Sequence, residues 1–417
     1  MHRPAARLAA LLAAPVALAL AGPGRADDQL PPVSERAKQV HAAGMLFDGH
    51  NDLPWRLRQD GDTAFTKLDI AKRLDSGQTD IPRLREGGVK AQYWSVYIPS
   101  EQPNPARTVL DQIDLVYRMV ERYPDDFALA TSADEVEAAV KAGKIASLIG
   151  IEGGVAIEDD LALLRDFARL GARYMTLTHN KTLGWADAAT DGPKHAGLTE
   201  FGERVVREMN RLGMLVDISH VSPEVMDDVL RVSKAPVIAS HSSARAIADH
   251  PRNIPDAILK RIPANGGVVM VNFYSGFVVP AAVRQNREAQ ADLQKKYPDP
   301  AEYQKALREF NRAHPMPRGT VGDVADHIMH IIAVAGVDHV GIGSDFDGIT
   351  SSPVGLDDAS DYPRLTEELL RRGVSEGDVH KILGGNALRA LRKAGEVAAE
   401  LRKSTRPEVD QPKPSAR

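Results

Sequence analysis

Seven side chains that could bind a metal or transfer a proton each lie at the end of a short apolar run. The runs, such as LFDGHNDLP, IASLIGIEGG and VGIGSDFDG, have the composition of buried parallel strands. Polar chemistry at the carboxyl ends of successive strands is typical of the (β/α)8 barrel. The pattern therefore favours a metal-dependent hydrolase on such a barrel, with these candidate residues: His50, Asp52, Glu152, His179, His220, His241 and Asp345.

Taken singly, each of these signals is weak. His50 and Asp52 are two residues apart, so on a strand both side chains point to the same face. Glu152 precedes two glycines that allow a sharp turn, although a lone Glu there more often faces a helix N-terminus. His220 and His241 each follow a serine, and either one alone would more often be a core histidine.

Taken together, these groups indicate a metal site. Burying several imidazoles and carboxylates in one barrel mouth without a metal would cost much free energy. Three imidazoles with carboxylates suit Zn²⁺ or a similar transition metal, whereas Mg²⁺ and Ca²⁺ prefer all-oxygen sites. A shared carboxylate would allow two metal ions in one centre.

The elements that must position these residues alternate along the chain. Eight short apolar segments have the character of strands covered on both faces, and helical patterns lie between most of them. Such alternation predicts a parallel sheet, and eight units can close into a barrel. The expected strands are 45–50, 91–98, 145–151, 174–178, 215–219, 237–240, 268–272 and 340–344, and the expected helices are 109–122, 133–142, 161–170, 199–212, 223–232 and 321–335.

Composition and the two ends of the chain narrow the expected partners, localisation, domain bounds and metal ligands. The 417 residues are 43% hydrophobic and carry a net charge of −5, so we expect no nucleic-acid partner. Residues 1–26 have the basic start, apolar stretch and small-residue site of a cleaved signal peptide, which predicts a periplasmic or secreted protein without a membrane anchor. We expect a single catalytic domain over 27–401, with an insertion at 281–318 on the active-site rim, and a disordered tail over 402–417. There is no Cys, so metal ligands must be His and carboxylates.

Nine blocks of the sequence, in order from about residue 40 to 395, resemble the membrane (renal) dipeptidase family of zinc peptidases. That resemblance implies a (β/α)8 barrel with two Zn²⁺ ions and a bridging hydroxide. By position, His50 and Asp52 would hold the first zinc, His220 and His241 the second, and Glu152 would bridge both. The blocks are DGHNDLPW, IEGG, LTHN, WAD, NRLGMLVDISHVS, APVIASHSSARAI, RNIPD, VMVNFY and GSDFDG.

The resemblance also implies roles for residues that bind no metal. Asp345, for which Asp347 is a rival, would move a proton from water to the leaving amine, and His179 would stabilise the oxyanion. Arg252 would bind the carboxylate of the substrate, and Tyr274 would line the pocket. Relatives are frequently dimers, so a homodimer is a possible assembly. Phe277 stands where relatives carry Tyr, which removes a hydroxyl from the site.

The primary hypothesis is an exported zinc dipeptidase that hydrolyses free dipeptides, with tolerance of a C-terminal D-residue as in some relatives. The alternative is an N-acyl amino acid deacylase or lactonase on the same dinuclear centre. A third hypothesis, a non-catalytic binding protein, requires a lost ligand, and none of the expected ligands is missing.

Overall fold

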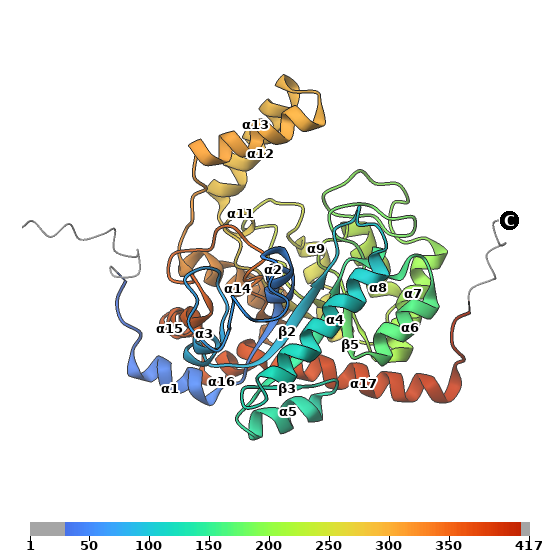
Figure 1. The fold of residues 1–417 in the computed structure, drawn as a ribbon, viewed down its shortest axis with the longest axis horizontal. Coiled ribbons are helices and arrows are strands. Elements are labelled where there is room, and N and C mark those ends of the chain that lie inside the picture. Colours follow the sequence, from blue (N-terminus) through green and yellow to red (C-terminus); the bar gives the residue numbers. More distant parts are fainter. Residues whose placement is uncertain (1–29, 410–417) are drawn as a thin grey trace, which may run out of the picture.

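A computed structural model of the chain describes residues 30–409, and its centre is a closed barrel of eight parallel strands (Figure 1). Neighbouring strands pair in chain order, and the barrel closes where β2 pairs with β4 from Ala91–Ala146 to Tyr97–Glu152. The barrel strands are β1 (Leu46–Asn51), β2 (Val89–Tyr97), β4 (Ile145–Glu152), β5 (Ala172–Thr176), β6 (Leu215–Asp217), β7 (Val237–Ala239), β8 (Val268–Val271) and β9 (Val340–Ile342). A ninth strand, β3 (Phe127–Leu129), pairs with β4 outside the closed ring.

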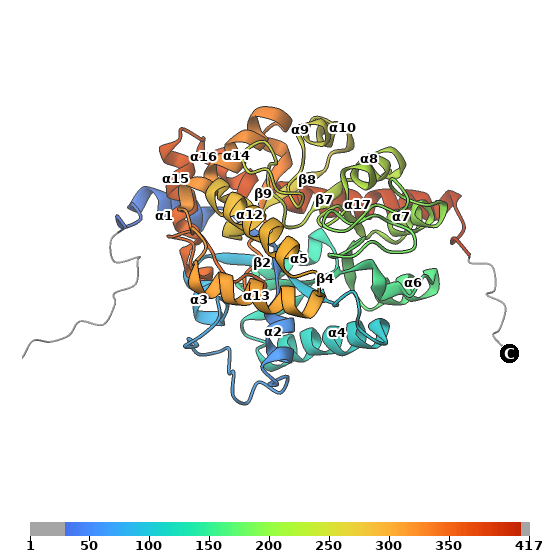
Figure 2. The same ribbon diagram turned by 90° about the horizontal axis from the view of Figure 1, so that it is seen from above.

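Helices surround the barrel, as the views in Figures 1 and 2 show. Short 3₁₀ or π turns at 154–157, 337–339, 359–361 and 381–385 join some of them. The helices are α1 (Glu35–Ala43), α2 (Leu53–Gln59), α3 (Ile81–Glu86), α4 (Pro105–Arg122), α5 (Ala133–Lys141), α6 (Leu161–Arg169), α7 (Glu200–Leu212), α8 (Pro223–Val232), α9 (Asp256–Leu259), α10 (Ile262–Asn265), α11 (Ser275–Val278), α12 (Pro280–Lys296), α13 (Pro300–Ala313), α14 (Val321–Ala335), α15 (Tyr362–Arg371), α16 (Glu376–His380) and α17 (Asn386–Ser404).

The predicted barrel is confirmed, and local sequence signals explain the boundaries of its helices. Helices α8 and α14 occupy the ranges predicted for them. The side chain of Ser222 caps α8 before Pro223, and Thr320 and Asp323 form a capping box at the start of α14. The sequence analysis missed β3, a three-residue strand that pairs only with the first half of β4, because so short a segment has no readable period.

Strands β6 and β9 each end two residues earlier than predicted, and this difference shapes the site. After β6 the backbone of His220 turns into the left-handed region with φ 67°, and after β9 Asp345 does the same with φ 65°. Few non-glycine residues adopt this conformation, and such strain is concentrated at functional sites. The two side chains are therefore aimed by tight turns above the barrel, not by the pleat of a strand.

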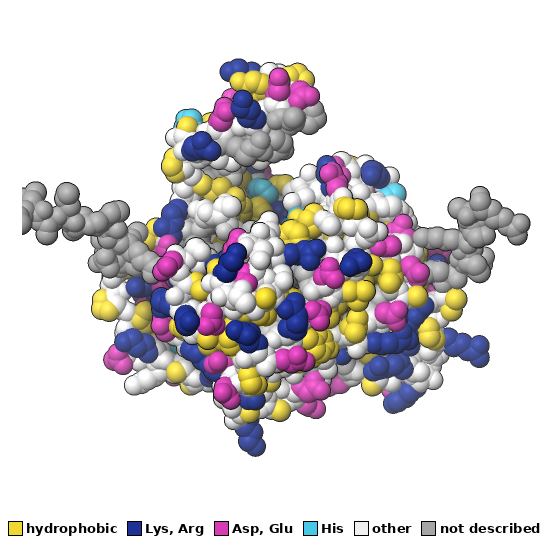
Figure 3. Space-filling view, in the orientation of Figure 1, with side chains coloured by type: hydrophobic (Ala, Val, Ile, Leu, Met, Phe, Trp, Pro, Cys, Tyr) yellow, Lys and Arg dark blue, Asp and Glu magenta, His cyan; other side chains and the backbone are white. Residues whose placement is uncertain are grey.

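Helices α12 and α13 form an arm that stands clear of the barrel (Figures 1 and 3). Apart from Pro280, the arm lies within the segment 281–318 that was predicted to be an insertion, and α12 follows directly after α11. On the face shown in Figure 3, basic and acidic side chains are mixed over the main body.

At the C-terminal end, α17 continues to Ser404, and Glu408 pairs with Arg204 and Arg207 of α7 at 3.3 Å each. Disorder was predicted from residue 402, whereas α17 includes 402–404 and Glu408 contacts α7. Residues 410–417 of that expected tail, and the expected signal peptide at 1–26, lie outside the described residues. Within residues 30–409, no helix combines the length and apolarity needed to cross a membrane.

Candidate metal centre and active site

Glu152, the last residue of β4, lies between two groups of potential metal ligands. Its Oε2 is 3.3 Å from His50 Nε2, and its Oε1 is 3.0 Å from His220 Nε2. The side chain is buried, with only 4% of the residue exposed. One carboxylate oxygen thus faces each group, which is the arrangement that a bridging ligand requires.

The first group consists of His50 and Asp52 with Glu152. His50 is the penultimate residue of β1, and Asp52 is the N-cap of α2. The two side chains converge, with His50 Nε2 3.3 Å from Asp52 Oδ2. The intervening Asn51 points away and donates a hydrogen bond to Thr79. The structure thus brings His50 and Asp52 together, although Asp52 lies beyond the end of β1 and not on the strand.

The second group consists of His220 and His241 with Glu152. The two Nε2 atoms are 2.9 Å apart, and His241 Nε2 is 3.5 Å from Glu152 Oε1. Burial lowers the pKa values of both imidazoles well below the usual range, so both are neutral, which is the form that binds metal. Two neutral ring nitrogens so close to each other and to a carboxylate fit a shared cation.

Buried ligand atoms without hydrogen-bond partners also indicate that these residues fit a metal. His50 Nε2 and Asp52 Oδ1 are buried without a hydrogen-bond partner among the described residues. The other nitrogen of His50, Nδ1, lies 2.8 Å from the hydroxyl of Tyr174, which leaves Nε2 free to face the cluster. Burial opposes the charge of Glu152, but His50 and His220 hold the pKa of its carboxyl well below the usual range, so it is ionised.

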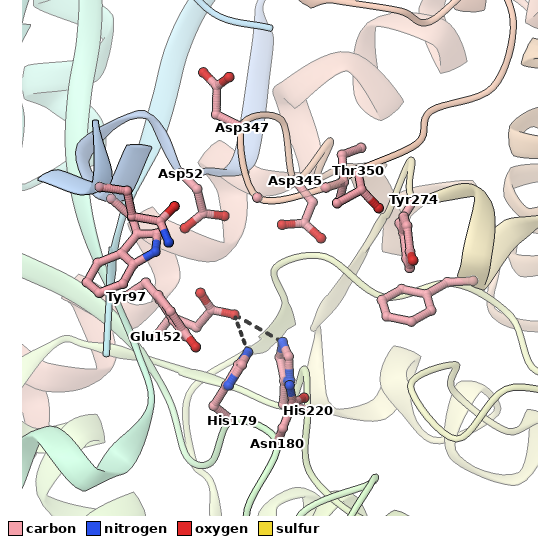
Figure 4. A pocket seen from close by; sticks show the side chains of 15 residues that line it. Asp52, Tyr97, Glu152, His179, Asn180, His220, Tyr274, Asp345, Asp347 and Thr350 are labelled. Atoms are coloured by element: carbon pink, nitrogen blue, oxygen red, sulfur yellow. Dashed lines mark ion pairs between the residues drawn. The ribbon is translucent and has the colours of Figure 1, made fainter. Parts of the chain in front are cut away.

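Three of the candidate ligands, Asp52, Glu152 and His220, line a cavity of about 430 Å³, a size typical of small-molecule sites (Figure 4). Glu152, His179 and His220 lie on one side of it, and Asp52 and Asp345 point into it from the opposite side. The lining residues are Asp52, Trp55, Gln59, Tyr97, Glu152, His179, Asn180, His220, Tyr274, Phe277, Asp345, Asp347, Gly348, Ile349 and Thr350.

Asp345 and Asp347, the two candidates for the proton-transferring carboxylate, point their side chains in different directions. Asp345 Oδ1 is 4.0 Å from His50 Nε2, and its Oδ2 accepts a hydrogen bond from Asn272 at 2.8 Å. Asp347 points away from the ligands in Figure 4 and pairs with Arg56 at 3.4 Å. Burial, helped by the carboxylates of Asp52 and Glu152, raises the pKa of Asp345 well above the usual range.

Arg252 is placed differently from the other candidate residues. Its side chain is 2% exposed, its guanidinium lies 5.3 Å from the Phe277 ring centre, and it is not among the residues that line the cavity. It donates hydrogen bonds to Ser242 Oγ and to the carbonyl of His241, while Nε has no partner. No described carboxylate forms an ion pair with this buried cation, so an external anion would compensate it.

Several site residues escaped the sequence analysis. Tyr97 ends β2 opposite Glu152 and contacts the His179 ring edge-on at 4.8 Å between centres. Asn180 follows His179 at the rim, and Tyr174 supports His50 from β5. Tyr97 could have been predicted, because it lies at the end of an apolar run as the seven candidates do. The contact between Tyr174 and His50 could not, because these residues are 124 positions apart in the sequence.

Together, the closed barrel and the His and carboxylate groups at its carboxyl-terminal mouth define a metal-dependent hydrolase of the TIM-barrel type. The sequence model of the membrane dipeptidase family, peptidase family M19, matches residues 34–405. The chain belongs to this family and is a metallopeptidase of the dipeptidase type.

Solved structures agree with this assignment. The probable dipeptidase PvdM from Pseudomonas aeruginosa is 25% identical with a TM-score of 0.78, over 87% of this chain and 98% of that one. A metallopeptidase from Rhodobacter sphaeroides, liganded with a phosphinate mimic of L-Ala-D-Ala, is 26% identical with a TM-score of 0.70, over 84% and 99%. A metallopeptidase described as dipeptidase AC is 28% identical with a TM-score of 0.69, over 84% and 98%.

Proposed function

We propose that this protein is a zinc dipeptidase with two Zn²⁺ ions, which hydrolyses free dipeptides and accepts a D-residue at the C-terminal position. The observation that carries the proposal is the position of Glu152 between His50 and the His220–His241 pair. Imidazole and carboxylate donors in this mixture suit Zn²⁺. The tolerance of a D-residue is supported by the Rhodobacter sphaeroides relative, whose ligand mimics L-Ala-D-Ala.

The proposed ligands are His50 and Asp52 for one ion, His220 and His241 for the other, and Glu152 for both. Bound zinc would supply an acidified water and polarise the peptide carbonyl. Asp345 would accept a proton from the attacking water and deliver it to the leaving amine, a task that suits a carboxyl whose pKa is raised by burial. His179 is neutral, because burial lowers its pKa, and it lines the cavity where it would donate to the developing oxyanion.

Arg252 would limit the substrate to dipeptides. A buried guanidinium without a carboxylate partner is a strong site for the terminal carboxylate of a substrate, and a longer chain would place its own carboxylate elsewhere. Phe277 packs against the guanidinium but has no hydroxyl. Arg252 would therefore bind the substrate carboxylate without a hydrogen bond from residue 277.

Arg252→Ala is expected to reduce kcat/KM for L-Ala-L-Ala by about 100-fold, in line with the loss of a charge-assisted contact. The effect should be much smaller for L-Ala-L-Ala amide, because that substrate has no terminal carboxylate to bind. Steady-state kinetics on both substrates, with circular dichroism to verify folding, make the comparison. Equal losses on the two substrates would rule out carboxylate recognition.

The function itself is tested with four substrates, L-Ala-L-Ala, L-Ala-D-Ala, tri-Ala and N-acetyl-Ala, before and after chelation. Hydrolysis of both dipeptides is expected to disappear with chelator and to return with Zn²⁺, while tri-Ala stays intact. Liquid chromatography of the products provides the measurement. Cleavage of N-acetyl-Ala alone would instead favour the deacylase alternative on the same centre, and retention of full activity after verified metal removal would contradict the metal mechanism.

We also propose that residues 27–401 form one catalytic domain and that residues 1–26 direct export and are then removed. A mature N-terminus at Asp27 follows from the small residues Gly24 and Ala26 before it. Intact-mass measurement of protein from the periplasm or medium of the producing cell is expected to give a chain that begins at Asp27. An uncleaved chain confined to the cytoplasm would contradict the proposal.

A further inference from the structure

A buried carboxylate below the metal ligands, Asp217, has every hydrogen-bonding position occupied by a donor. Its Oδ2 accepts from Thr176 Oγ1 at 2.5 Å and from Ser240 Oγ at 2.6 Å. Its Oδ1 accepts from the backbone N–H of Ser219 at 3.0 Å and of Ser240 at 2.9 Å. The residue is fully buried, and it is the acceptor in all four of these hydrogen bonds. Asp217 therefore acts only as an acceptor.

This constraint passes through Ser240 to His241. Ser240 Oγ is 2.7 Å from His241 Nδ1 as well as 2.6 Å from Asp217 Oδ2, and a hydroxyl has one proton. Because Asp217 can only accept, the hydroxyl proton of Ser240 is directed to it. Ser240 Oγ must then accept from His241 Nδ1, which carries the ring proton. His241 Nε2 is left with its lone pair facing His220 and Glu152.

We infer that Asp217 and Ser240 are positioning residues that fix His241 in its metal-binding tautomer. The inference rests on the proposed zinc centre, and it assigns a role to two side chains that touch neither substrate nor metal. Histidine ligands are commonly oriented in this way by a partner on the second ring nitrogen. Here the partner is a serine whose own direction is set by a buried carboxylate on the neighbouring strand.

The barrel contains a matched arrangement that lacks the imidazole. Asp48 of β1 accepts hydrogen bonds from Ser344 N and Ser344 Oγ, both at 2.7 Å, as Asp217 does from Ser240. Ser344 precedes Asp345 as Ser240 precedes His241, but no histidine ring nitrogen bonds to Ser344 Oγ among the described contacts. Ser344→Ala therefore removes the same kind of hydroxyl–carboxylate bond without affecting a ring tautomer.

The experiment compares zinc affinity of metal-free wild type, Asp217→Asn, Ser240→Ala and Ser344→Ala, measured by competition with a chromophoric chelator. In Asp217→Asn the amide oxygen keeps the two backbone donors, so the NH₂ group faces Ser240. The serine proton then turns to His241 Nδ1, and the ring proton moves to Nε2, where it blocks coordination. We expect the weaker zinc site of Asp217→Asn to lose about 10- to 100-fold in affinity. Ser240→Ala removes the hydrogen bond to His241 Nδ1 but does not force the ring proton onto Nε2, so its zinc affinity should fall less. The zinc affinity of Ser344→Ala should stay close to that of wild type.

Thermal unfolding of the metal-free proteins shows which variants are folded. If Asp217→Asn does not fold, the zinc affinity of Ser240→Ala still tests the inference. Unchanged zinc affinity in Ser240→Ala and Asp217→Asn would overturn the inference. So would an equal loss in Ser344→Ala, because a general weakening of the strand ends would then explain the result. Wild type that binds no zinc would instead contradict the proposed function.

Discussion

Glu152→Gln is expected to reduce kcat/KM for dipeptides by at least about 10³-fold, or about 4 kcal/mol of transition-state stabilisation. Glu152 is the one described side chain whose two oxygens face both histidine groups, with Oε2 toward His50 and Oε1 toward His220 and His241. The amide is neutral and presents an NH₂ group to one side, so it cannot serve two cations equally. Metal content should therefore fall together with activity.

The measurement pairs steady-state kinetics with metal analysis of the purified protein. Glu396→Gln on α17 is the matched control, since this carboxylate is exposed and its ion-pair partner among the described residues is Lys393, at 2.9 Å. It should retain both metal and activity. Full metal content and near-normal turnover in Glu152→Gln would show that the centre is not built around this residue.

Asp345→Asn is expected to lower kcat by about 10²- to 10⁴-fold, the range for removal of a general acid–base group. Asn has nearly the same shape and tolerates the left-handed backbone at this position, so the loss should not come from misfolding. Bound metal should remain, because Asp345 is not a proposed ligand. The metal-free variant should also unfold at a higher temperature, since one carboxyl is removed from beside Asp52 and Glu152.

Asp347→Asn separates the two rival carboxylates. Asp347 accepts from the backbone N–H of Gln78 at 2.7 Å and pairs with Arg56, so its loss should lower stability more than turnover. Kinetics and thermal unfolding of the two variants, measured side by side, decide the assignment. A severe loss of kcat in Asp347→Asn with a mild loss in Asp345→Asn would exchange their roles.

The barrel and the residues at its mouth could be predicted from the sequence. Apolar runs of strand length alternate with helical periods, and both signals are local, so the positions of α8 and α14 could be predicted to the residue. The polar residue at the end of each run identified the side chains that the structure brings together around Glu152. Ser222 and Thr320 provided cap signals of the same local kind.

The directions in which those side chains point could not be predicted from the sequence, because they depend on contacts formed by folding. Glu152 divides its oxygens between His50 and His220, and these residues are far apart in the chain, so no local pattern encodes their facing atoms. The tautomer of His241 depends on Asp217, which lies on the adjacent strand and reaches it through Ser240. The resemblance implied that Arg252 binds the substrate carboxylate, but the sequence did not reveal that its guanidinium is buried without an ion-paired carboxylate among the described residues. A period in the sequence reports which face of an element is buried, whereas hydrogen-bond direction and charge compensation depend on partners that only folding brings within a few ångströms.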